Sequence, residues 1–96
     1  MNALNQSEFT VEHRLKAIGF RPRTSQGLVR ACNLDRIDRA LSAIDGAVGK
    51  CGYKRQKLVQ EADGGTMHYW KDSQRNLMMV KASKGRLSCH IIPADG

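Results

Sequence analysis

The chain has 96 residues and a formal net charge of +7, from 16 Lys and Arg against 9 Asp and Glu. This length suits one compact domain and leaves little room for a large cofactor pocket, so we expect a single domain without a cofactor. A strong excess of positive charge indicates either a polyanionic partner, such as nucleic acid or an acidic protein surface, or a charge that serves only the solubility of the chain.

The cysteines and the hydropathy pattern set the expected compartment. Cys32, Cys51 and Cys89 are an odd number without a closely spaced pair, so the sequence does not predict a disulfide framework. The first ten residues are polar, and no apolar run approaches the roughly 18 residues of a membrane span. We therefore expect a cytoplasmic protein with free thiols and no membrane partner.

The N-terminal part of the chain predicts a flexible segment and then one short helix. Residues 1–9 are polar and without a helical period, and we expect them to be flexible. Thr10 suits the N-cap of a helix over about 10–19. Gly19 suits the C-terminal end of this helix, and a helix cannot continue through Pro22. The next segment, 20–27, has no apolar period, so we expect an exposed loop.

The clearest helical pattern covers residues 34–51. Its apolar positions step by three and four and form one stripe: Leu34, Ile37, Leu41, Ile44, Val48 and Cys51. Asn33 suits the N-cap, Gly52 suits the end, and Asp35 and Arg39 stand at the spacing of a helical ion pair. Whether residues 28–32 extend this helix or form a short strand is open.

After Gly52 the apolar period changes to two, which predicts an antiparallel meander of three to four strands over about 57–92. The segments are 57–62, 66–71, 77–82 and 87–92, separated by turn residues. A two-residue turn at Lys84-Gly85 places Ala82 opposite Leu87, Val80 opposite Cys89 and Met78 opposite Ile91, with Lys81 opposite Ser88 and Met79 opposite His90 on the other face. The first hairpin of the meander allows a turn at Asp63-Gly64 or at Gly64-Gly65.

The elements together predict an α+β domain over residues 10–93, with a tail at 94–96. The longer helix packs on one face of the sheet. The other face is partly exposed to solvent, and Leu77, Met79 and Ile92 on it suggest a homodimer interface.

The basic residues occur in three runs that contain no acid. They lie between Glu12 and Asp35, between Asp45 and Glu61, and between Asp72 and Asp95. Such runs suit phosphate contacts, although scattered solvated charges would give the same pattern. The candidate anion-binding residues are Arg21, Arg23, Lys54, Arg55, Lys57, Arg75, Lys81, Lys84 and Arg86.

The aromatic pair Tyr69 and Trp70 allows two interpretations. An exposed Trp70 on a basic sheet would stack on a nucleotide base. Because neighbouring strand residues face opposite sides, only one of the two faces the core, and the alternative is that Trp70 closes that core.

Catalytic and metal-binding patterns are weak. Cys89 and His90 are neighbours on a predicted strand and point to opposite faces, and no spacing typical of a zinc site occurs. We therefore expect no metal. A small endoribonuclease would need His90, Lys81 and Arg75 on one face.

We expect a non-enzymatic module that binds nucleic acid through phosphate contacts. The first alternative is a protein-binding inhibitor or regulator of a nucleic-acid-handling complex. Short basic α+β chains without catalytic motifs resemble accessory proteins of mobile elements, such as anti-CRISPR inhibitors and antitoxins, and this analogy carries the alternative. The second alternative is the endoribonuclease.

Overall fold

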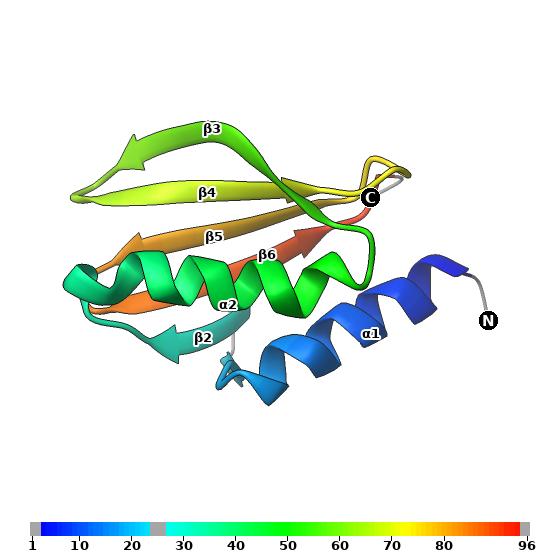
Figure 1. Ribbon diagram of the computed structural model, residues 1–96, viewed down its shortest axis with the longest axis horizontal. Coiled ribbons are helices and arrows are strands. Elements are labelled where there is room, and N and C mark those ends of the chain that lie inside the picture. Colours follow the sequence, from blue (N-terminus) through cyan, green and yellow to red (C-terminus); the bar gives the residue numbers. More distant parts are fainter. Residues whose placement is uncertain (1–2, 24–26, 95–96) are drawn as a thin grey trace.

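The computed structural model describes residues 3–23 and 27–94, with side chains from Thr10 onward except that of Ala62. Two helices cover one face of a six-stranded antiparallel sheet (Figure 1). The strand order is β1-β2-β6-β5-β4-β3. The elements are α1 (Ala3–Ala17), β1 (Arg21–Arg23), β2 (Gly27–Ala31), the 3₁₀ turn η1 (Leu34–Arg36), α2 (Ile37–Gly49), β3 (Lys54–Ala62), β4 (Gly65–Lys71), β5 (Leu77–Ser83) and β6 (Arg86–Ile92).

Helix α1 begins earlier than the sequence pattern predicts. It starts at Ala3, so Thr10 lies inside the helix and not at its N-cap, and most of the expected flexible segment is helical. The predicted end is close, because the chain turns at Gly19 with φ of 103°. Residues 1–2 of the expected flexible segment, 24–26 of the expected loop, and 95–96 of the expected tail lie outside the described residues.

Helix α2 is shorter than the predicted 34–51 at both ends, because η1 takes up the first three residues and the helix ends at Gly49. Asn33 makes no side-chain cap, and its carbonyl accepts the N–H of Arg36 instead. Leu34 lies in η1 and is 59% exposed, so it leaves the apolar stripe. Ala40, Leu41, Ile44 and Val48 make up the buried face of the helix.

The sheet has six strands where the sequence predicts three to four. The two additional strands form a hairpin from the segment 21–31, which was expected to be a loop and an undecided segment. β2 pairs with the last strand, with Leu28 opposite Cys89, and β1 pairs with β2 at the edge. Pro22 is compatible with β1 because proline has no N–H to donate, and an edge strand has one side on which no donor is needed.

The register of the last hairpin agrees with the sequence prediction at every pair. Ala82 lies opposite Leu87, and Val80, Met78, Lys81 and Met79 pair as expected. In the hairpin formed by β3 and β4, Ala62 pairs with Gly65, so the turn is Asp63-Gly64. Both of its central residues have positive φ, as a type I′ turn requires.

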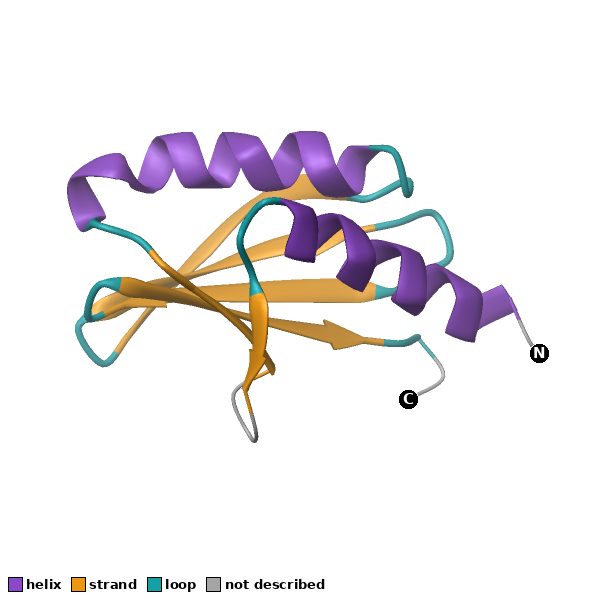
Figure 2. Cartoon of the chain, turned by 90° about the horizontal axis from the view of Figure 1, so that it is seen from below, coloured by secondary structure: helices purple, strands orange, loops and turns teal. Residues whose placement is uncertain are grey.

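The core lies between the helices and the inner face of the sheet (Figure 2). Alternation along β5 buries Met78, Val80 and Ala82 and directs the residues between them to the other face. Trp70 on β4 is fully buried among them. No helix in the described part of the chain is long and apolar enough to cross a bilayer.

Candidate nucleic-acid interface

The uncovered face of the sheet is basic. Its strand residues include six lysines and arginines and one histidine: Arg21, Arg23, Lys54, Lys71, Lys81, Arg86 and His90. No acidic side chain faces this side from the described paired positions of the strands. Both helices lie on the opposite face (Figure 2), so this charge is available to a partner, apart from that of Arg21, which is bonded to the end of α1.

Three of the predicted residues meet at one hollow on this face. Lys81, Lys84 and Arg86 line a cavity of about 290 Å³ at the β5–β6 turn, together with Ser83 and Ser88. Asp63, from the β3–β4 turn, is the one acidic residue in its wall. Three cations and two hydroxyl groups around one hollow provide the hydrogen-bond donors that a phosphate group needs.

Lys84 occupies an unfavourable backbone position. It has φ of 53° as the first residue of the two-residue turn, where Asn or Asp is preferred. A β-carbon costs roughly 1 kcal/mol in this conformation. The chain therefore places a cation beside the hollow at the expense of turn stability, which is a pattern typical of functional sites.

Among the described strand positions the aromatic residue on the uncovered face is Tyr69. Of the two interpretations of Trp70, closure of the core is confirmed and stacking on a base is wrong. Trp70 is fully buried, so neither face of its ring is accessible. Its indole N–H donates to Asp45 Oδ1 at 2.8 Å. Tyr69 is half-buried on the outer face, and its hydroxyl donates to Gln60 Oε1 at 2.6 Å.

Arg55 is drawn to the helix side of the sheet. It lies opposite Trp70, and its Nη2 is 3.1 Å from Asp45 Oδ2. Asp45 thus accepts from both side chains and joins α2 to β3 and β4. The charge of Arg55 is compensated by this carboxylate, so it is a poorer anion ligand than the sequence suggests.

The other candidate residues lie apart from the hollow. Lys57 is exposed in an irregular part of β3, where the pairing shifts between Arg55 and Val59. Lys54 is at the start of β3 opposite Lys71. Arg75 lies in the β4–β5 turn with φ of 68°.

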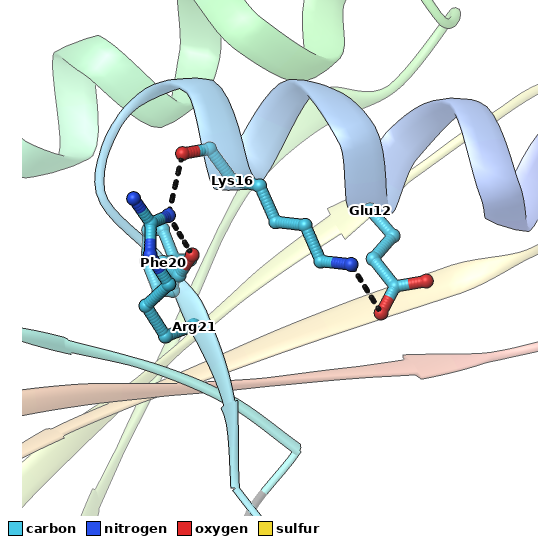
Figure 3. A network of polar contacts seen from close by, with 4 residues as sticks. All are labelled: Glu12, Lys16, Phe20 and Arg21. Carbon is cyan, nitrogen blue, oxygen red and sulfur yellow. Dashed lines mark hydrogen bonds and ion pairs between the residues drawn. The ribbon is translucent and has the colours of Figure 1, made fainter.

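Arg21 and Arg23 lie on the edge strand β1. The Nη1 of Arg21 donates to the carbonyls of Lys16 and Phe20, at 2.9 and 2.8 Å, and so caps the end of α1 (Figure 3). Lys16 in turn pairs with Glu12 at 3.7 Å. Arg21 therefore has a structural role, whereas Arg23 is exposed at the same edge.

The ribonuclease residues do not form one cluster along the strands. His90 and Lys81 both face outward near Met79. Arg75 stands in the turn before β5, so two rows of outward residues, at Leu77 and Met79, separate its backbone from the row of Lys81. The arrangement supplies a cationic surface more readily than an acid–base pair.

The inner face contains one half-buried histidine. Burial lowers the pKa of His68, the charge of Arg55 lowers it further, and Asp38 opposes the shift. The Nε2 of His68 lies 2.8 Å from the hydroxyl of Thr66. This imidazole faces the helices and does not belong to the outer surface.

Cys89 and His90 point to opposite faces, as the strand alternation predicts. Cys89 is buried opposite Val80, and burial raises its pKa to about 12. Within the described ranges no three His, Cys, Asp or Glu side chains gather in an arrangement that could hold a metal ion.

Comparisons with protein-family models, with curated proteins and with solved structures find no match for this chain. The geometry of the surface is therefore the basis for any functional proposal.

Sequence reasoning missed Tyr69, Ser83 and Ser88. The predicted pairing of Lys81 with Ser88 already placed that serine beside the cation. Tyr69 required the register of the hairpin at Asp63-Gly64, which the sequence left open.

Proposed function

We propose that the chain binds nucleic acid through phosphate contacts on the uncovered face of the sheet. The observation that supports this proposal is the hollow where Lys81, Lys84 and Arg86 meet on a face whose described strand positions contain no acid. Neutralising phosphates releases counterions, and this release favours binding most strongly at low salt.

Tyr69 extends the proposed interface beyond the phosphates. It lies directly opposite Met79 and diagonal to Lys81, at a spacing of roughly 7–8 Å. A base stacked on the tyrosine would then have its backbone near the lysine. Stacking on an aromatic side chain requires an unpaired base, which favours a single strand over a duplex.

The test is fluorescence anisotropy with labelled single-stranded DNA, RNA and duplex DNA over a salt series. We expect the affinity to fall steeply with salt. In the variant Lys84→Glu/Arg86→Glu, which changes two exposed residues, the log–log slope decreases by about two units. The matched control is Arg14→Glu/Lys50→Glu, which makes the same change in charge on α1 and after α2.

Two results would refute this proposal. One is the absence of binding near physiological salt. The other is an equal loss of affinity in the control variant, which would reduce the effect to net charge.

A specific observation favours the alternative of a protein partner. β3 is an edge strand, and Leu58 and Val59 on it are 63% and 48% exposed. An open edge with apolar side chains suits pairing with a strand of another protein. The variant Leu58→Gln would weaken such a complex and, because it changes no charge, would leave phosphate binding unchanged.

The homodimer interface proposed from the sequence would compete with nucleic acid for the same face. Leu77 and Ile92 lie directly opposite each other on it, and Ile92 is 41% exposed. Light scattering with and without an oligonucleotide distinguishes a homodimer interface on this face from nucleic-acid binding there. A dimer on this face dissociates when the oligonucleotide binds.

A further inference from the structure

A second cationic cavity lies where β2 ends and the long helix α2 begins. Its volume is about 340 Å³, and three arginines from three consecutive elements contribute to its wall. They are Arg30 from β2, Arg36 from η1 and Arg39 from α2. No acidic residue lines the cavity.

Arg30 is the unusual member of this group. Its Nη1 is buried and has no hydrogen-bond partner. The side chain also lies close to the α1–β1 turn, because a β-carbon on Gly19 would stand 3.6 Å from its Cδ. A buried guanidinium nitrogen without an acceptor costs free energy, and the side chain that carries it also lines the cavity.

The nearest acids in the sequence do not compensate these arginines. Asp35 and Asp38 belong to the same two elements, but neither forms an ion pair with Arg36 or Arg39 within the described part of the chain. The expected pair of Asp35 and Arg39 is absent because Asp35 lies in η1, before α2 begins. Three guanidinium groups therefore share one cavity without a counter-charge.

We propose that this cavity binds a phosphate group. A guanidinium donates two parallel hydrogen bonds to oxygens of a phosphate, and a phosphate offers enough oxygens for more than one arginine. Its charge also compensates three cations better than a single carboxylate does. The proposal does not depend on the nucleic-acid interface, since the three arginines do not line the hollow at the β5–β6 turn.

The phosphate group has two sources, a free phosphate compound or the phosphates of a nucleic acid. For the phosphates of a nucleic acid, the structure offers a continuous row of cationic hollows from this cavity to the hollow at the β5–β6 turn. Arg30 and Ala31 also line an open hollow with Arg21, Arg23 and Arg86, and Arg86 borders the hollow at the β5–β6 turn. A single strand is flexible enough to pass over this edge of the sheet, whereas short duplex DNA is stiff.

The experiment is an NMR titration of the whole chain with inorganic phosphate, with chloride and acetate at equal ionic strength as references. We expect saturable shifts of the amide signals of residues 30–40 with phosphate only. Arg30→Met removes the orphaned nitrogen and keeps an unbranched side chain, and it weakens phosphate binding at least tenfold.

A second variant tests the same cavity in case Arg30→Met does not fold. Arg36→Gln/Arg39→Gln changes two exposed residues and has the same expected effect, while Arg14→Gln/Lys50→Gln keeps the affinity of the native chain. Equal shifts with chloride or acetate would overturn the proposal, as would equal weakening in the Arg14/Lys50 control.

The source is identified with oligonucleotides that carry either a 5′-phosphate or a 5′-hydroxyl. A preference for the 5′-phosphate that Arg30→Met abolishes supports binding of a nucleic-acid end. Phosphate binding without that preference supports a free phosphate compound. Because Lys84→Glu/Arg86→Glu leaves this cavity intact, failure of the first interface is distinguishable from failure of this one.

Discussion

Two groups of charged residues, one on each face of the sheet, differ in whether their charge is compensated by a neighbouring residue. On the helix-covered face Arg55 is paired with Asp45, and the same carboxylate accepts the indole N–H of Trp70. On the uncovered face Lys81, Lys84 and Arg86 meet around a hollow that has Asp63 as its single acid. The comparison indicates that the contacts of Asp45 stabilise the fold, whereas the cations around the hollow are available to a partner.

The neighbouring aromatics Trp70 and Tyr69 give the largest expected contrast. Trp70→Ala leaves a cavity in the core and lowers the free energy of unfolding by about 3–5 kcal/mol. Tyr69→Ala changes stability far less and weakens binding of a single strand by about 1–3 kcal/mol. Urea denaturation and anisotropy measure the two effects, and a large stability loss in Tyr69→Ala would contradict the division between faces.

Asp45 tests the compensated face. Asp45→Ala removes the acceptor of the buried indole N–H and the partner of Arg55, and it lowers the free energy of unfolding by about 1–3 kcal/mol. The exposed Asp35 provides the matched control, because Asp35→Ala removes the same charge without a buried donor. Similar denaturation midpoints for the two variants would show that the Asp45 contacts contribute little.

Lys84 tests the uncovered face with effects of opposite sign. Lys84→Asn suits the positive φ of the turn and raises the free energy of unfolding by roughly 1 kcal/mol. It also removes a cation from the hollow and weakens nucleic-acid binding. A variant that is more stable and binds as well as the native chain would show that this lysine does not serve the interface.

His68 gives the smallest effect, a pH dependence of stability. Its pKa is lowered in the folded state, mainly by burial, so the unfolded chain binds the proton first. Above pH 6.5 His68 is neutral in both states and does not lower the free energy of unfolding. As the pH falls from 6.5 through the lowered pKa, the unfolded chain binds more protons and the free energy of unfolding decreases. Denaturation at several pH values follows this fall, which His68→Gln diminishes and His90→Gln preserves.

The sequence predicted the elements whose pattern is strong and local. The register of β5 and β6 follows from two matching apolar rows around Lys84-Gly85, and the α2 stripe from regular spacing. The α+β class followed from these two patterns.

The parts that sequence reasoning missed depend on distant partners. β1 has three exposed residues and includes Pro22, so its existence depends on pairing with β2 and not on local propensity. The first half of α1 has no apolar period, and η1 rotates Leu34 out of the stripe.

The site was predictable to the extent that it follows the last hairpin. Lys81, Lys84 and Arg86 are close together because a tight turn joins their strands. The meeting of Arg30 with Arg36 and Arg39 depends on where α2 begins, and the pairing of Arg55 depends on how α2 lies on β4. Neither is set by spacing along the chain.

The pairing of Leu28 with Cys89 also has a consequence for biosynthesis. The pairs β3–β4, β4–β5 and β5–β6 each join strands that are neighbours in sequence, so this part of the sheet can form from local contacts. The β1–β2 hairpin joins the sheet only through the pairing of β2 with β6. During translation β1 and β2 can therefore join the rest of the sheet only after β6 has left the ribosome.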